Sequence, residues 1–266
     1  MIERWTVSKP FEREGRGLHS GVPVKATIHP GNEGIWFRHK GERVQAIPEN
    51  VSETRRCTKL GSISTIEHLM SAFAGCGITD AEVELTAPEL PALDGSALLF
   101  AQSILASGRE KISEVPMPEL FTRIFVQEEG VKIAISRGQG HWCYEYDCSP
   151  RWPGRQQWEA ANVADVYTSE IAPARTFAFG EEIEAAQAAG LGRGLDESSV
   201  LILGEAGFRN EARFKDEPAR HKLLDLIGDL YLAGIPVTHL NVSAERSGHA
   251  ANVKAALLLR KALLPN

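Results

Sequence analysis

The chain has 266 residues, of which 43% are hydrophobic and 24% are charged, and its formal net charge is −6. This composition is typical of a soluble globular protein with enough apolar residues to fill a core, and the negative net charge argues against general binding to nucleic acid. No apolar run approaches the roughly 20 residues that a membrane-spanning helix needs, and the N-terminal segment Met1–Glu14 lacks the apolar core of a signal peptide, so we expect a cytoplasmic protein without a transmembrane segment.

In the first half of the chain, the spacing of apolar residues predicts two helices. Ser64–Gly75 carries an apolar stripe at helical spacing, and we expect Ser64 to cap this helix, with Glu67 three residues later in a capping-box arrangement. The second helix is Ser96–Ser107, which Gly108 ends. Strands are expected at Ile35–Arg38 and Ala81–Leu85.

A polar segment with two prolines, Ser107–Glu119, follows the second helix and is the best candidate for a domain boundary. We therefore predict an N-terminal domain of residues 1–112 and a C-terminal domain of residues 113–266. Strands and helices are expected in both halves, which favours the α+β fold class over an all-β protein or a helical bundle.

The second half of the chain contains the clearest helix, Pro218–Ala233. Pro218 suits the first turn of a helix, and Gly234 suits the position just after its end. A last helix, rich in alanine and leucine, is predicted over Ala250–Leu263. Strands are expected at Leu120–Val126, Val131–Arg137, Trp142–Cys148 and Thr238–Ser243.

The cysteines indicate a reducing compartment. None of the four forms a Cys-x-x-Cys pair. We therefore expect free thiols rather than a disulfide framework. The four residues are Cys57, Cys76, Cys143 and Cys148.

Two polar residues on the Pro218–Ala233 helix have the spacing of metal ligands. His221 and Asp225 are four residues apart, which places them on one face of the helix, and Asp229 lies one turn further along. Zn²⁺ takes imidazole and carboxylate ligands, and a catalytic site uses three protein ligands. The alternative is that these residues form the solvated face of an amphipathic helix, because His-x-x-x-Asp occurs often by chance.

Two further histidines are candidates for chemistry. His68 could be a third ligand, and the adjacent Glu67 could accept a proton from water. Alternatively, Glu67 only completes the capping box and His68 is an ordinary half-buried histidine. His249 follows a glycine after a predicted strand, where an active-site acid could lie, although such a residue is also common in surface loops.

Six segments in order along the chain resemble the UDP-3-O-acyl-N-acetylglucosamine deacetylases, the LpxC family. Any one segment is a weak signal, but six in the order of the family are a strong one. They span nearly the whole chain and include all of the candidates above. The segments are Gly15–Gly21, Ser64–Leu69, Ala87–Ser96, Ala174–Phe177, Arg220–Asp229 and Ser247–His249.

The resemblance implies a fold of two α+β domains, each with a layer of strands, with the helices packed between the two sheets and the site at the domain junction. It implies a Zn²⁺ site of His68, His221 and Asp225, with Glu67 as the general base. It further implies that His249 is the general acid or a cationic stabiliser, oriented by Asp229, and that Thr176 lies near the developing oxyanion. The expected substrate contacts are Lys222, Phe177, Arg246 and His19.

The function that follows is zinc-dependent deacetylation of UDP-3-O-acyl-N-acetylglucosamine, the committed step of lipid A biosynthesis, by a protein that we expect to be a monomer. Departures from the family pattern leave the acyl specificity open. Arg55 and Arg56 stand where apolar residues are expected, and Ala178–Gly190 is rich in alanine. The alternatives are a related zinc deacetylase that acts on a different N-acetylated sugar or amide, and a metal-stabilised binding protein without turnover. Glu67 and His249 argue against the last, since a binder needs neither.

Overall fold

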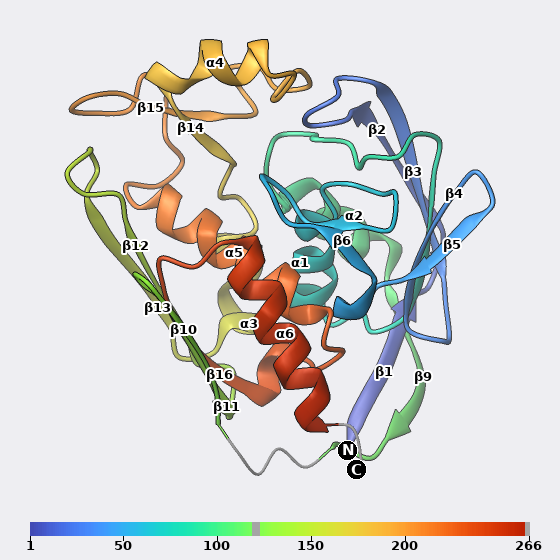
Figure 1. The fold of residues 1–266 in the computed structure, drawn as a ribbon. Helices are drawn as coiled ribbons and strands as arrows, with labels where there is room; N and C mark the ends of the chain where they lie inside the picture. Colours follow the sequence, from blue (N-terminus) through green and yellow to red (C-terminus); the bar gives the residue numbers. More distant parts are fainter. Residues whose placement is uncertain (119–122, 264–266) are drawn as a thin grey trace.

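The computed structural model describes residues 1–118 and 123–263 and consists of two mixed five-stranded sheets with the long helices between them (Figure 1). The α+β fold with helices packed between two sheets is therefore confirmed. In the described part of the chain, no helix is long and apolar enough to cross a membrane. The four cysteines are free thiols, as expected.

The first sheet has the order β2-β3-β8-β4-β5. Its last strand in the chain, β8, lies in the middle, antiparallel to β3 and parallel to β4. Buried and solvent-facing residues alternate along β3 and β8, so that one face of the sheet covers the helices. The strands are β2 (Phe11–Arg16), β3 (Pro23–Pro30), β4 (Ile35–His39), β5 (Glu42–Gln45) and β8 (Ala81–Leu85).

The second sheet repeats this topology in the order β10-β11-β16-β12-β13. Here β16 is the last strand in the chain and again lies in the middle, antiparallel to β11 and parallel to β12. The two sheets therefore have the same arrangement of two hairpins around a late central strand. The strands are β10 (Ile124–Glu128), β11 (Val131–Arg137), β12 (Trp142–Asp147), β13 (Arg155–Ala160) and β16 (Leu240–Glu245).

Each half also inserts a small two-stranded sheet between its second hairpin and its first long helix. In the first half this is β6 (Val51–Glu53) with β7 (Lys59–Leu60), and η1 (Pro48–Asn50) precedes it. In the second half the short helices α3 (Val163–Val166) and η2 (Tyr167–Ile171) come first. The parallel pair β14 (Phe177–Phe179) and β15 (Leu201–Leu203) follows, with η3 (Gly180–Glu182) and α4 (Ile183–Ala188) between its strands.

In the described part of the chain, four long helices fill the space between the sheets, and two of them cross closely. They are α1 (Glu67–Cys76), α2 (Leu98–Ser107), α5 (Glu217–Tyr231) and α6 (His249–Leu263). At the α1–α5 crossing, a Cβ atom on Gly228 would come within 2.1 Å of the Glu67 carbonyl oxygen. Only glycine permits this approach, which brings the first turn of α1 against the polar stripe of α5.

The termini of several elements differ from the prediction, and the expected capping box on the first helix is wrong. α1 begins at Glu67 with Ile66 at its N-cap and no side-chain cap. The Ser64 amide instead donates to the Pro88 carbonyl, because the segment before α1 is tied to the neighbouring loop. The expected strand at Thr238 begins only at Leu240, since η4 (Val237–His239) precedes it.

Other boundaries shift by a few residues. α2 begins at Leu98 and not at Ser96, whose hydroxyl accepts from the Leu98 amide. The strand expected from Leu120 begins at Ile124, and residues 120–122 lie outside the described chain. The predicted domain division between residues 112 and 113 falls inside β9 (Arg109–Val115), which pairs with β1 (Ile2–Val7). The division into two domains stays a prediction.

Candidate active site

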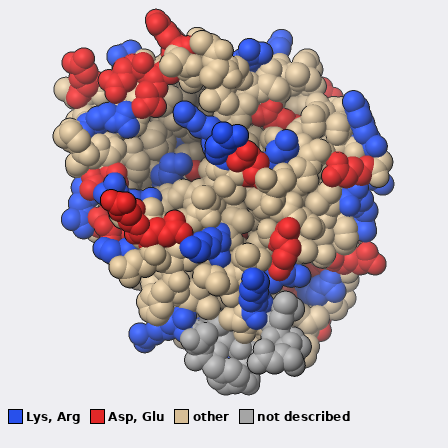
Figure 2. Space-filling view, in the orientation of Figure 1, with Lys and Arg blue, Asp and Glu red and all other residues tan. Residues whose placement is uncertain are grey.

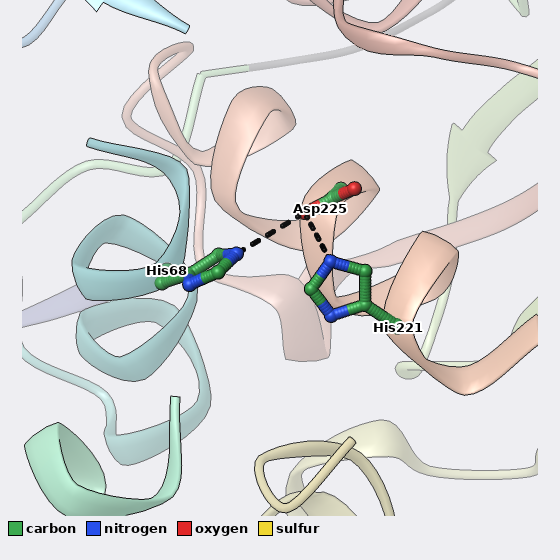
Figure 3. A group of neighbouring side chains, drawn as sticks. All are labelled: His68, His221 and Asp225. Atoms are coloured by element: carbon green, nitrogen blue, oxygen red, sulfur yellow. Dashed lines mark ion pairs between the residues drawn. The ribbon is translucent and has the colours of Figure 1, made fainter. Parts of the chain in front are cut away.

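Three candidate metal ligands meet where α1 crosses α5. The side chains of His68 and His221 point toward Asp225 from two sides (Figure 3). The Nε2 atoms of His68 and His221 lie 3.7 Å and 3.5 Å from Oδ1 of Asp225, and one donor atom from each residue lies within 4.8 Å of the others. All three side chains are buried. Sequence spacing suggested the α5 pair, residue types and the family resemblance suggested His68, and the fold brings the three together.

The chemistry of these donors fits a bound zinc ion. Oδ1 of Asp225 is buried and has no hydrogen-bond partner among the described residues, although a buried carboxylate oxygen without one is costly. His221 Nδ1 donates to the Ala174 carbonyl oxygen at 3.1 Å, which leaves Nε2 with a free lone pair in the neutral ring. Two imidazoles and a carboxylate are a ligand set that zinc takes in catalytic sites.

The protonation states suit a cation as well. Burial and the neighbouring His221 lower the pKa of His68 to about 3, so its ring is neutral at pH 7. Burial also lowers the pKa of His221. Although burial acts to raise the pKa of Asp225, the neighbouring His221 and Lys222 hold that pKa well below its usual range. Lys222 Nζ donates to Asp225 Oδ2 at 2.9 Å, so only Oδ1 is left for a metal.

A second group of ionisable side chains lies beside the candidate ligands. His249 Nδ1 donates to Asp229 Oδ2 at 2.9 Å, and His249 Nε2 faces Glu67 Oε1 at 4.0 Å. Burial raises the pKa of Glu67 to about 8. Burial alone would lower the pKa of His249, but the charge and hydrogen bond of Asp229 outweigh it and raise this pKa to about 9. His249 is therefore cationic at pH 7.

Sequence reasoning missed one member of this group, Thr58. Its amide donates to Glu67 Oε2 at 3.0 Å, and its hydroxyl donates to Asp229 Oδ1 at 2.5 Å. Its side chain is completely buried. Thr58 lies in an irregular stretch between β6 and β7, where neither hydrophobic periodicity nor a capping pattern exists to mark it.

The remaining candidates lie at different distances from this centre. The Phe177 ring packs edge-on against the His221 ring, and Lys222 Nζ lies 5.6 Å from the Phe177 ring centroid. Thr176 is half-buried, and its amide donates to the Gly95 carbonyl. Arg246 is exposed, and its guanidinium approaches Gly130 in the β10–β11 turn. Among the described residues, no hydrogen bond or ion pair joins Arg246 to the metal ligands.

His19 lies on the loop between β2 and β3, which a buried carboxylate holds in place. Glu89 accepts hydrogen bonds from the amides of His19 and Ser20. His19 Nδ1 in turn accepts from the Gly192 amide at 3.4 Å, while its Nε2 is buried without a hydrogen-bond partner in the described chain. Burial lowers the pKa of His19, so its ring is neutral at pH 7.

A cavity of about 430 Å³ adjoins Phe177 and is mostly apolar. Its walls come from both inserted segments, because Arg56 lies between β6 and β7 while the rest belongs to β14, η3, α4 and the loop after α4. Figure 2 shows Lys and Arg side chains gathered on the face below α4. The lining residues include Phe179, Ala185, Ala186, Ala189 and Leu191.

The family model for UDP-3-O-acyl N-acetylglycosamine deacetylase, LpxC, matches residues 4–261. The chain belongs to this family. It is 34% identical to the UDP-3-O-acyl-N-acetylglucosamine deacetylase of Cellvibrio japonicus over 97% of this chain and 90% of the relative. It is 38% identical to the deacetylase of the same name from Stenotrophomonas maltophilia over 96% of this chain and 89% of the relative. It is 33% identical to the one from Neisseria gonorrhoeae over 95% of this chain and 88% of the relative.

The six segments that carried the resemblance to the LpxC family lie on connected parts of the fold. Ser64–Leu69 and Arg220–Asp229 supply the three candidate metal ligands and Glu67, and Ser247–His249 supplies the histidine that faces Glu67. Ala174–Phe177 provides the carbonyl that binds His221 and the ring that packs on it. The other two segments are joined through Glu89 and the loop of His19.

Proposed function

We propose that the chain is a zinc-dependent hydrolase that cleaves the N-acetyl amide of UDP-3-O-acyl-N-acetylglucosamine, the committed step of lipid A biosynthesis. The observation that carries the proposal is the buried cluster of His68, His221 and Asp225, which lies beside an acid–base pair of Glu67 and His249. Membership of the deacetylase family supports the choice of substrate. Zinc held by the three ligands would supply Lewis acidity to water and to the amide carbonyl, and a positive field that favours the ionised form of Glu67.

The side chains of the protein then divide the proton transfers between them. Glu67 accepts a proton from the attacking water, since its Oε1 is the oxygen that Thr58 leaves free. His249, kept cationic by Asp229, donates a proton to the amine nitrogen as the C–N bond breaks. We assign to Thr176 the stabilisation of the oxyanion by its hydroxyl. The products are acetate and the free amino sugar.

Substrate binding is assigned to groups around this centre. Lys222 is the cation next to the ligands, and it lies over the Phe177 ring at the edge of the apolar cavity. We assign the cavity to the 3-O-acyl chain because its walls are mostly apolar. Arg246 and His19 are proposed as contacts to the rest of the substrate, including its diphosphate. A diphosphate contact would weaken as the ionic strength rises.

The test combines metal analysis with an acetate-release assay on three compounds. The purified protein should contain about one zinc per chain and should release acetate from UDP-3-O-acyl-N-acetylglucosamine far faster than from UDP-N-acetylglucosamine or N-acetylglucosamine. Turnover of the unacylated compounds at equal rates would support a relative that acts on another N-acetylated sugar. Bound zinc without acetate release from any of them would support a binding protein and contradict the proposal. Metal-stripped protein reloaded with zinc is the matched control.

We further propose that the protein acts as a monomer in the cytoplasm. The four free thiols support a reducing compartment. Light scattering coupled to gel filtration measures the molar mass directly, and a dimer would contradict the first part. Fractionation of cells that express the native chain tests the second part.

A further inference from the structure

Thr58 is attached through its backbone to the residue that we assign as the general base. Its amide donates to Oε2 of Glu67 at 3.0 Å, and its carbonyl oxygen accepts from the Ile66 amide at 3.2 Å. The two bonds fix the chain that enters α1, and they commit one oxygen of the Glu67 carboxylate. The other oxygen, Oε1, is the one that faces His249.

The side chain of Thr58 reaches the opposite half of the molecule. Its hydroxyl donates to Oδ1 of Asp229 at 2.5 Å and lies 3.3 Å from Nδ1 of His249. The other carboxylate oxygen of Asp229 accepts from His249 Nδ1 at 2.9 Å and from Asn252 at 3.0 Å. Both oxygens of Asp229 are thus held, so the carboxylate cannot rotate without breaking a buried hydrogen bond.

A single completely buried residue therefore contacts the base, the histidine and the carboxylate that orients the histidine. We propose that Thr58 is a positioning residue for proton transfer, which aligns Glu67 through its amide and the Asp229–His249 pair through its hydroxyl. This inference rests on the proposed deacetylase function. Thr58 does not touch the reacting atoms itself, and its effect is to keep Glu67 Oε1 and His249 Nε2 facing the same space.

The hydroxyl can be removed without disturbing the backbone bond to Glu67. Thr58→Val keeps the shape of the side chain and the amide but leaves Asp229 Oδ1 without its donor, whereas Thr58→Ser keeps the donor. Misplacement of catalytic groups lowers the chemical step more than substrate binding. We expect Thr58→Val to lower kcat by about 10- to 100-fold with KM changed less than about threefold and zinc content unchanged, and Thr58→Ser to recover most of the loss.

Thr79→Val is the matched control, because the Thr79 hydroxyl also donates to a buried aspartate, Asp80, at 2.6 Å. Asp80 pairs with Arg4 on β1, outside the site. The control should lower the melting temperature about as much as Thr58→Val while leaving kcat near that of the wild type. A role of Thr58 in stability alone would give both variants normal kcat.

Three results would overturn the proposal: normal kcat in Thr58→Val, a loss in Thr58→Ser as large as in Thr58→Val, or an effect confined to KM. Should Thr58→Val not fold, Thr58→Ala, which adds no bulk beside the carboxylate, gives the same comparison with Thr58→Ser. Absence of deacetylase activity in the wild type would instead contradict the proposed function, so the two failures are distinguishable.

Discussion

The two halves of the molecule share one strand topology but contribute different chemistry. Each has two hairpins around a central strand, a small inserted sheet, and long helices on one face. In the N-terminal half, Glu67 and His68 occupy the first turn of α1. In the C-terminal half, α5 carries His221, Asp225 and Asp229 along three successive turns.

The difference shows how a repeated fold makes an asymmetric site. α1 contributes Glu67 and His68, both from its first turn, to the cluster at the α1–α5 crossing. α5 presents a lateral stripe, because positions four residues apart share one face of a helix. Gly228 lets the two helices approach closely enough for the first turn of α1 to meet the polar stripe of α5. Among the described residues, neither half alone holds all three candidate metal ligands or both Glu67 and His249.

The largest expected effect tests whether both halves are needed for the metal. His221→Ala, on α5, should lose most of the zinc and reduce activity to background, because two ligands hold a four-coordinate ion poorly. His68→Ala, on α1, should do the same. Metal analysis of the purified variants measures the loss, and His29→Ala, which removes a histidine outside the cluster, is the matched control. Full zinc occupancy in His221→Ala would show that the ligand assignment is wrong.

The next effect separates two roles of Glu67 on α1, one in proton transfer and one in the stability of the fold. Glu67→Ala should keep its zinc and its fold but lose about 10²- to 10⁴-fold in activity, the usual contribution of a positioned proton acceptor. If Glu67 served only to accept the buried Thr58 amide, the change would cost about 1–3 kcal/mol of stability and leave turnover near normal. One kinetic and one melting measurement therefore decide between the two roles.

The two helices differ in how much of the site their sequences reveal. His221 and Asp225 lie on one continuous helix, so their spacing alone placed them together. Residue types left the addition of His68 open, and the resemblance to the LpxC family implied it. The capping box at Ser64 and Glu67 was wrong because tertiary contacts of Glu67, with Thr58 and near His249, replaced the local bond.

Other features depend on contacts between distant parts of the chain. Thr58 and Asp229 are 171 positions apart, and no local pattern connects such a pair. The repeated topology was also hidden, since strand order depends on which strands pair rather than on their spacing. Element types were easier to predict than their ends, because hydrophobic periodicity marks the middle of a helix better than its termini.

A smaller effect concerns the His249–Asp229 pair, which only the C-terminal half contains. Activity should fall as pH rises through about 9, since His249 then loses the proton that it donates. Asp229→Asn should move this limb to lower pH, because the charge that raises the pKa of His249 is removed and burial lowers it. We expect a loss of about 10- to 100-fold at neutral pH, typical of an orienting partner.

The pH–rate profile of kcat measures this effect, with Asp147→Asn, an aspartate beside an exposed turn, as the matched control. In His249→Ala the high-pH limb should flatten. If the high-pH limb stays unchanged in this variant, His249 does not take part in proton transfer.

The smallest expected effect tests the two inserted segments, which build the apolar cavity together. The wall formed by α4 and the residue after it consists largely of Ala185, Ala186 and Ala189. A wall of small side chains buries less of each acyl CH₂ group than a wall of leucines, and a fully buried CH₂ contributes about 0.8 kcal/mol, or about fourfold in kcat/KM. We therefore expect kcat/KM to change by clearly less than fourfold for each CH₂ added to the 3-O-acyl chain.

Substrates that differ only in acyl-chain length measure this slope directly. Ala186→Leu should steepen it by adding apolar surface to the wall, whereas Ala188→Leu, on the exposed side of the same helix, should leave it unchanged. A steep preference of the wild type for one long chain would mean that the alanines already close on the substrate and that the prediction is wrong. A flat slope combined with turnover of unacylated sugars would favour the alternative substrate, because a cavity that gains nothing from an acyl chain cannot select for one.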